Sequence, residues 1–368
     1  FRRSAWAEFT LQKFNFYSLL YSKWSILIEN IEYFKSNGYE INFYNKEVEG
    51  LLDCDILFLS SRFFYKSNFK INTITSTLQR YSKINSNIIW FDLRDSAGTT
   101  QFEVLPYVKL YLKGQIYRDL SKYEKNFYGG RMYTDYYFNK YNISDTNLYE
   151  MSTLKKEYFK KIKVSWNLGV IRFDYLNNLD FFKKIYLRFK GKNEFLKIKE
   201  IDYSIKFLEK KYRTFAVFNL EFPRASVAYQ RKLALKKLDK INHFNDVFNI
   251  KLSKKKYLKK MSSSKYVLSC YGWGEICYRD WEAVISNSLI LKPDMSNIDT
   301  WPNLYSSHKT YIPLSWDLSD LEHQIESLEK GIYDLENIKK SAFEIYKSIR
   351  SNNCKIFRKR FINILNQV

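Results

Sequence analysis

The stretch SKYVLSCYGWGEICYRDWEAVISNSLILKPDM, from Ser264 to Met295, decides the fold because it predicts a strand, a glycine-bearing loop, a helix and a second strand. Tyr266 to Ser269 is a short β-rich run, and Ile276 to Ser286 has apolar residues at helical spacing. Leu289 to Leu291 supplies the next buried strand. This alternation is typical of a parallel α/β sheet, in which a ligand binds beyond the carboxyl ends of the strands.

The loop between these elements carries the polar residues. Gly272 and Gly274 permit a tight turn and a close backbone approach, and the start of the following helix favours a phosphate group. Glu275 and Glu282 are seven positions apart, so we expect both carboxylates on one helix face. An alternative stays open, because these glutamates could form an ordinary solvated ion ladder with Arg279.

The same segment resembles the donor-nucleotide segment of GT-B glycosyltransferases, especially the bacterial group 1 glycosyl transferases of cell-surface polysaccharide assembly. The resemblance rests on Glu282-Ala283, which stands in a helical run that ends before a buried strand. It implies that Glu282 binds the ribose hydroxyls of a nucleotide sugar and that Glu275 contacts the donor sugar. The sequence departs from the family pattern, since Glu275 is one position closer than usual and Asn287 stands where the family commonly has glycine.

The rest of the chain extends this α/β pattern. Apolar periodicity predicts helices over 24–35, 71–82 and 227–240, strands over 40–44, 54–60, 88–92, 108–112 and 213–220, a helical turn over 114–120 and helix from 318 onward. The region 123–165 has no clear pattern. We expect two Rossmann-like domains that face a cleft: an acceptor domain over 1–200, a donor-nucleotide domain over 201–350, and a C-terminal helix over 351–368. The boundary is expected between Lys192 and Lys211.

A second candidate loop, Asp92 to Thr100, directly follows the strand that ends at Phe91. A glycosyl transfer with inversion needs a carboxylate that takes the proton from the acceptor hydroxyl. Asp95 is the first candidate for this base and Asp92 the second. The alternative is that Asp95 and Ser96 only form a turn or a helix cap.

A third loop, Asn219 to Ser226, follows a strand and opens a helix. A departing nucleotide needs positive charge and N–H donors when no metal neutralises it. Arg224 on this loop, Arg231 on the helix and Arg279 after the glycine loop are the candidates. The alternative for each is an ordinary surface arginine.

Cofactors and metals are not expected. The four cysteines and three histidines show no metal-ligand spacing, and the cysteines form no C-x-x-C pair, so structural zinc and disulfides are both disfavoured. The expected small molecule is the donor substrate, a UDP-, GDP- or CMP-linked sugar. The acceptor implied by the resemblance is a lipid-linked or polysaccharide glycan of lipopolysaccharide, O-antigen or capsule biosynthesis.

The net charge and the mean hydropathy of the chain indicate which classes of partner it can bind. The chain of 368 residues carries a formal net charge of +22 and 18% aromatic residues. Its mean hydropathy of −0.44 and the lack of an apolar run near twenty residues disfavour a membrane span. We expect a cytoplasmic protein whose basic surface contacts an anionic inner membrane, without nucleic acid as a partner. The alternatives are a basic nucleic-acid-binding protein and an inactive glycan-binding relative of GT-B enzymes.

Overall fold

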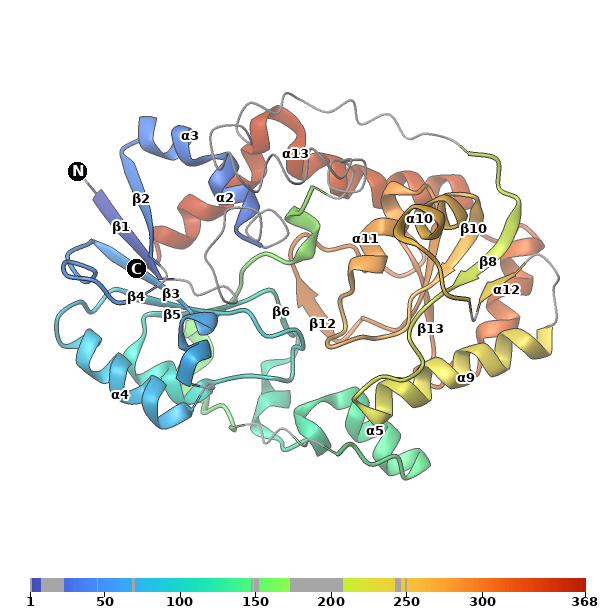
Figure 1. Cartoon of the computed structure of the whole chain (residues 1–368), viewed down its shortest axis with the longest axis horizontal. Coiled ribbons are helices and arrows are strands. Elements are labelled where there is room, and N and C mark those ends of the chain that lie inside the picture. The colour runs from blue at the N-terminus through green and yellow to red at the C-terminus, as the bar shows by residue number, and fades with distance from the viewer. Residues whose placement is uncertain are drawn as a thin grey trace.

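The protein contains two parallel sheets that lie side by side in the computed structural model (Figure 1). The structure describes residues 2–7, 23–44, 46–67, 70–146, 148, 152–172, 208–241, 246–248 and 250–368. The expected class, an α/β protein built from two Rossmann-like sheets, is confirmed by these sheets.

The first sheet has six strands in the order β2-β1-β3-β4-β5-β7, and every neighbouring pair is parallel. Strands β3 and β4 are buried along their whole length, because their residues are almost all apolar and lie in the middle of the sheet. The elements of this half are β1 (Arg2–Ala7), α2 (Ser25–Glu29), α3 (Ile31–Ser36), β2 (Tyr39–Tyr44), β3 (Ile56–Ser60), α4 (Ile71–Ser82), β4 (Ile88–Asp92), β5 (Leu110–Lys113), α5 (Met132–Tyr141) and β7 (Ile162–Val164).

The second sheet has five parallel strands in the order β13-β11-β10-β8-β9. The opening stretch of the sequence forms β10, the glycine loop, α11 and β11 of this sheet. The elements are β8 (Tyr212–Ala216), α9 (Ala225–Ile241), β9 (Val247–Phe248), α10 (Lys254–Ser262), β10 (Ser264–Leu268), α11 (Tyr278–Ile285), β11 (Leu289–Pro293), β13 (Ile312–Leu314) and α12 (Leu321–Glu329).

A small antiparallel ribbon joins the two halves. It pairs β6 (Gln115–Tyr117) with β12 (Ile298–Thr300), so one strand comes from each half of the chain (Figure 1). The predicted helical turn over 114–120 is therefore wrong. The segment is extended because it finds a strand partner far along the sequence, which local periodicity cannot reveal.

The last long helix, α13 (Leu335–Leu365), also links the halves, because it runs along the top of the molecule in Figure 1 from the second sheet back toward the first. Its backbone leaves the helical conformation from Ser351 to Cys354, and Asn352, Asn353 and Cys354 have positive φ. The predicted C-terminal helix over 351–368 corresponds to the part of α13 beyond this break.

Several short 3₁₀ segments connect these elements: η1 (Ser61–Ser67), η2 (Phe102–Tyr107), η3 (Leu120–Glu124), η4 (Tyr128–Gly130), η5 (Lys156–Lys161) and η6 (Leu168–Val170). The predicted domain boundary between Lys192 and Lys211 lies mostly outside the described residues. Within the parts of the chain that the structure describes, there is no helix both long and apolar enough to cross a membrane.

Candidate functional site

The loop after β4 and the glycine loop after β10 meet between the two sheets, and Glu275 holds them together. One carboxylate oxygen of Glu275 accepts a hydrogen bond from Ser96 Oγ at 2.9 Å. The other accepts from the Ala97 N–H at 3.1 Å and from Gln115 Nε2 at 2.9 Å. Glu275 is only 4% exposed. Its carboxylate therefore fastens the two halves in this structure, and contact with a donor sugar stays a prediction.

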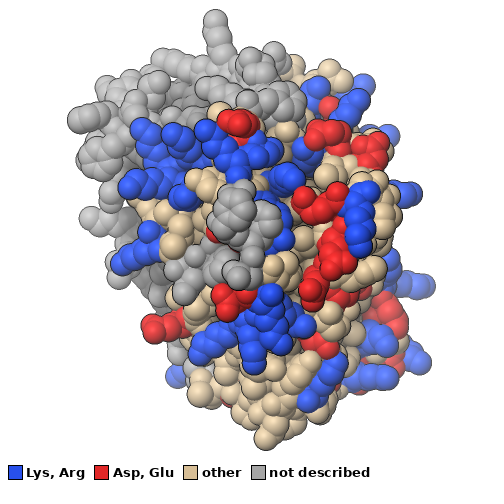
Figure 2. All heavy atoms as spheres, turned by 90° about the vertical axis from the view of Figure 1, so that its right-hand side faces the viewer, with Lys and Arg blue, Asp and Glu red and all other residues tan. Residues whose placement is uncertain are grey.

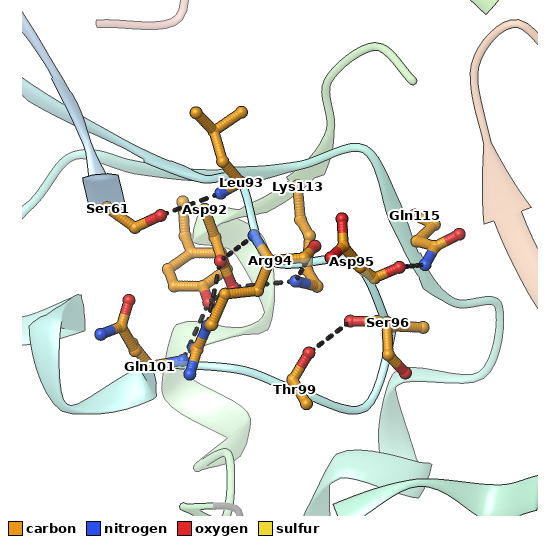
Figure 3. Close-up of polar contacts among 12 residues, drawn as sticks. Ser61, Asp92, Leu93, Arg94, Asp95, Ser96, Thr99, Gln101, Lys113 and Gln115 are labelled. Atoms are coloured by element: carbon orange, nitrogen blue, oxygen red, sulfur yellow. Dashed lines mark hydrogen bonds and ion pairs between the residues drawn. The ribbon is translucent and has the colours of Figure 1, made fainter. Parts of the chain in front are cut away.

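Gly274 allows these two loops to approach closely. A Cβ atom on Gly274 would lie 1.7 Å from the backbone oxygen of Asp95, a distance at which no side chain fits. Gln115 Nε2 also donates to that same Asp95 oxygen (Figure 3). The expected close backbone approach at this glycine therefore occurs, and its partner in the structure is the other half of the chain.

Asp92 lies at the end of β4 and is fully buried among donors (Figure 3). Lys113 stands opposite it in the register of β5, and Lys113 Nζ lies 2.9 Å from Asp92 Oδ2. Tyr111 Oη donates to the same oxygen at 2.6 Å, and the Arg94 N–H and Nε donate to Oδ1 at 2.9 and 3.1 Å.

This network sets the protonation state of Asp92. Burial alone would raise the pKa of the carboxyl group, but the positive charges of Arg94 and Lys113 outweigh burial and hold the pKa well below its usual range. A general base works best when its pKa lies near the working pH. Asp92 is thus placed as a structural anchor, and its second-choice assignment as the base does not fit this geometry.

Asp95 is exposed, unlike Asp92, and lies on the loop that touches the glycine loop. Lys23, which precedes α2, is close enough to Asp95 and to Arg62 of η1 to interact electrostatically with both. Burial lowers the pKa of the Lys23 ammonium to about 8, against the opposing attraction of Asp95. The position of Asp95 between the two halves is compatible with the predicted role as a base.

Arginine side chains gather around the glycine loop. Arg231 is 5% exposed and points from α9 to the backbone just before Gly272. Its Nε and Nη2 donate to the Tyr271 carbonyl at 3.2 and 2.9 Å, and its Nη1 donates to the Asn219 carbonyl at 2.7 Å. These three hydrogen bonds hold the Arg231 guanidinium group against the backbone that leads into the glycine loop.

Arg224 and Arg279 reach the same loop from two other directions. Arg224 Nη1 donates to the Trp273 carbonyl at 3.0 Å and to Tyr133 Oη at 2.5 Å. Arg279 Nη1 lies 3.4 Å from the Cys270 carbonyl. The structure thus brings together the three arginines that the sequence predicted.

None of the ion pairs among the described residues joins one of these three arginines to a carboxylate. The Asp280 carboxylate acts electrostatically on Arg279 without forming such a pair. The hydrogen bonds of Arg224, Arg231 and Arg279 to described residues go to neutral carbonyl and hydroxyl oxygens. Burial and the charge of Arg279 both lower the pKa of Arg231. Like charges held close together in a partly buried site favour an anionic ligand.

The two glutamates of the opening stretch do not share a helix face. Helix α11 begins at Tyr278, so Glu275 precedes it and only Glu282 belongs to it. Glu282 is 6% exposed and pairs with Lys254 at the start of α10. The expectation of two carboxylates on one face is wrong, because residues 273–276 form bends and the helix starts only after Cys277.

Asp280 is a buried acid at the start of α11 that sequence reasoning did not single out. It accepts from the Cys277 N–H at 2.9 Å, from Ser269 Oγ at 2.5 Å and from Tyr305 Oη at 2.7 Å, and Lys292 Nζ lies 3.2 Å away. Asp280 already places a negative charge at the N-terminus of α11. This N-terminus is therefore not free to bind the phosphate of a ligand, and the positive charge for an anion at the glycine loop must come from the arginines. An Asp at the third position of a helix is the sequence signal that could have revealed this cap.

Among the described residues, the cysteines and histidines do not form a set of metal ligands. None of the four cysteines forms a disulfide bond, and burial raises the pKa of the Cys270 thiol to about 11. In the part of the chain that the structure describes, no group of three or more His, Cys, Asp and Glu side chains has the geometry to hold a metal ion. His243 lies outside the described residues.

The basic charge on the face beside α9, α10 and α12 is divided into patches. Lys254, Lys255, Lys256 and Lys259 of α10 are exposed, whereas α12 exposes Glu322, Glu326 and Glu329. Figure 2 shows groups of basic side chains on this face with acidic side chains between them. On this face, therefore, the positive charge does not form one continuous strip.

The chain is thus a two-sheet α/β protein with an arginine-lined loop between its halves. No family model matches it, and no curated protein matches it. Many solved structures resemble it, including the next three, which do so over nearly the whole chain. A glycosyltransferase from Rickettsia africae ESF-5 is 11% identical over 100% of this chain and 98% of that chain, with a TM-score of 0.47.

HepE from Anabaena, solved with UDP-glucose, is 9% identical over 100% of both chains, with a TM-score of 0.45. An alpha-glucosyltransferase, solved with UDP and a 13-mer DNA containing an HMU base, is 12% identical over 99% of both chains, with a TM-score of 0.41. All three TM-scores lie below 0.5, so the ligands of those proteins do not establish what this chain binds.

Proposed function

We propose that the protein is a glycosyltransferase that moves a sugar from a nucleotide-sugar donor to a glycan acceptor. The observation that carries the proposal is the arginine cluster at the glycine loop. Arg224, Arg231 and Arg279 approach one loop at the carboxyl end of a parallel sheet, and their described partners are neutral oxygens. Guanidinium groups in this setting suit the phosphates of a nucleotide.

The roles of the residues follow from this placement. The arginines neutralise the phosphate charge that develops when the bond between the anomeric carbon and the phosphate oxygen breaks. The acceptor oxygen forms the new bond to that carbon, and its proton passes to the exposed carboxylate of Asp95. Glu282 binds the ribose hydroxyls, with Lys254 fixing one of its carboxylate oxygens.

This chemistry needs no bound metal, because the arginines supply the positive charge that a metal would otherwise provide. The donor is a UDP-, GDP- or CMP-linked sugar. The acceptor is a lipid-linked or polysaccharide glycan, such as those of lipopolysaccharide, O-antigen or capsule, and the exposed lysines of α10 support a peripheral contact with anionic lipid head groups.

A thermal-shift panel with an Arg279→Gln variant tests the proposal. A ligand that binds only the folded state raises the melting temperature, so UDP, GDP, CMP and their sugar conjugates are compared at low and physiological salt. We expect one nucleotide class to stabilise the protein in both salts. Arg279→Gln should weaken that nucleotide about tenfold or more, since a charged hydrogen bond contributes about 1.5–3 kcal/mol.

Lys232→Gln is the matched control, because Lys232 follows Arg231 on α9, is exposed and carries the same charge. It should leave nucleotide affinity unchanged. The proposal fails if no nucleotide raises the melting temperature, or if Lys232→Gln weakens binding as much as Arg279→Gln does. The same panel on Glu282→Ala tests the ribose assignment, which unchanged nucleotide affinity would contradict.

A further inference from the structure

A pocket separate from the glycine loop opens between α5 and the segment that follows β13. Its volume is about 430 Å³. The lining comes from both halves of the chain and consists of Phe127, Met132, Asp135, Tyr136, Asn139, Lys140 and Trp316. Lys140 Nζ donates to Asp317, and Tyr137 Oη donates to the Trp316 carbonyl. Helix α5 is therefore hydrogen-bonded directly to the segment that follows β13.

One face of α5 supplies most of the lining. Met132, Asp135, Tyr136, Asn139 and Lys140 follow a spacing of three, one, three and one, which places them along a single helical stripe. Other residues of α5 pack against η4 of the first half and against α9 of the second half. The pocket face thus combines aromatic and polar groups on a rigid element.

Two aromatic rings stand at right angles in the pocket. The ring centroids of Tyr136 and Trp316 are 5.5 Å apart with an interplanar angle of 88°. Trp316 Nε1 donates to the Asp294 carbonyl at 3.0 Å, and Lys140 Nζ donates to Tyr136 Oη at 3.0 Å. These bonds fix both rings, and the electron-rich face of a fixed ring attracts the C–H groups of a sugar.

Polar side chains lie beside the rings. Asp135 Oδ1 accepts from the Tyr128 N–H at 2.9 Å, and Asp135 Oδ2 accepts from Asn139 Nδ2 at 3.0 Å. A carboxylate has about four lone-pair sites, so these bonds leave acceptor capacity for hydroxyl groups. The Asn139 amide adds both a donor and an acceptor at the exposed rim.

The charge near this pocket differs in sign from the net charge of the protein. Lys140 Nζ lies 2.6 Å from Asp317 Oδ2, so the ammonium is already neutralised. Asp135 then remains as a negative charge in a protein whose formal net charge is +22. The Asp135 carboxylate disfavours a phosphate or a uronic acid beside it, whereas it does not disfavour an uncharged hydroxyl-rich ring.

We propose that this pocket binds a neutral hexose ring of the acceptor glycan, with the ring face on Trp316 and its hydroxyls on Asp135 and Asn139. The acceptor assignment rests on the proposed function, whereas sugar binding itself does not. Tyr133, on another face of the same helix, contacts Arg224 at the glycine loop. One helix therefore spans both sites, which would let a glycan held in the pocket extend toward the reacting centre.

Saturation-transfer difference NMR on the full chain, without nucleotide, tests this proposal. The probes are glucose, galactose, N-acetylglucosamine and, as an anionic comparator, glucuronic acid. We expect saturation transfer to the C–H protons of at least one neutral sugar, and less to glucuronic acid. Trp316→Ala should weaken the binding about tenfold, because it removes the stacking ring.

Two further variants keep the test decisive. Asn139→Leu removes the amide donor and acceptor at the exposed rim with little change in side-chain size, and it should weaken sugar binding even if Trp316→Ala does not fold. Tyr158→Ala removes a half-buried tyrosine that does not line the pocket and should leave binding intact. The proposal is overturned if no neutral sugar shows transfer, or if both pocket variants bind like the wild type. Nucleotide binding without sugar binding would overturn this inference alone.

Discussion

Two buried ion pairs organise the carboxyl ends of the sheets. Asp92 pairs with Lys113 in the first half and Asp280 pairs with Lys292 in the second, and all four side chains are 0% exposed. The sequence pointed to Asp92 as a polar residue after a strand, but its partner belongs to the next strand. Only the register of β4 and β5 reveals that pairing, so the sequence alone could identify the residue but not its partner.

Asp92→Asn should destabilise the protein by about 3–5 kcal/mol at neutral pH, because it leaves Lys113 buried without its counter-charge. The folded pKa of Asp92 is depressed, so the carboxylate contributes stability above the unfolded pKa, near 4, and that contribution is lost as the pH falls further. The difference between wild type and variant should therefore shrink below about pH 4. Urea unfolding at pH 7 and pH 3 measures it.

Glu47→Gln is the matched control for this charge removal. Glu47 pairs with Arg80 on the surface, where the two side chains are 48% and 56% exposed. Its loss should cost less than about 1 kcal/mol, because exposed ion pairs contribute little. Equal destabilisation by the two substitutions would show that burial does not set the strength of the Asp92 pair.

At the scale of elements, strands and helices with strong apolar periodicity could be predicted from the sequence. The predicted helix over 71–82 and the strand over 88–92 coincide with α4 and β4. Several other elements could not be predicted, among them β6 and α5. β6 depends on a distant partner in β12, and α5 is rich in tyrosines, which are amphipathic and blur the contrast between its faces.

The close contact between the glycine loop and the loop after β4 should make the protein sensitive to added side-chain volume at Gly274. Gly274→Ala should lower stability by about 1–3 kcal/mol, since its Cβ would overlap the Asp95 carbonyl and push the loops apart. Gly272→Ala is the control, because its Cβ would meet no atom closer than 3.3 Å. Thermal unfolding of both variants measures the effect, and an equal shift in melting temperature would contradict the proposed close approach.

For the whole molecule, the end of α13 completes the core of the first half. Phe361 lies with its ring centroid 4.9 Å from that of Phe34, and Trp166 lies against Phe357 at 5.4 Å. Arg358 Nε donates to Asn30 Oδ1 at 2.6 Å. The sequence predicted an N-terminal domain followed along the chain by a C-terminal domain. It did not indicate that the last helix returns to the first sheet, because that contact depends on tertiary packing alone.

Phe361→Ala should cost about 3–5 kcal/mol in the free energy of unfolding, because it opens a cavity in that core. Ile356→Ala, on the same helix but 47% exposed, should change stability by no more than about 0.5 kcal/mol. Hydrogen exchange locates the damage: amides of β3 should exchange faster in Phe361→Ala. Unchanged protection of β3 would mean that α13 does not support the first sheet.

The ribbon of β6 and β12 limits how such a protein can diversify. Each strand belongs to one half and finds its hydrogen-bonding partner in the other, and Glu275 is similarly shared with Ser96 and Gln115. A recombination event that exchanged one half for that of a relative would separate these partners. New donor or acceptor preferences are therefore more accessible through substitutions in loops and pockets than through shuffling of intact halves.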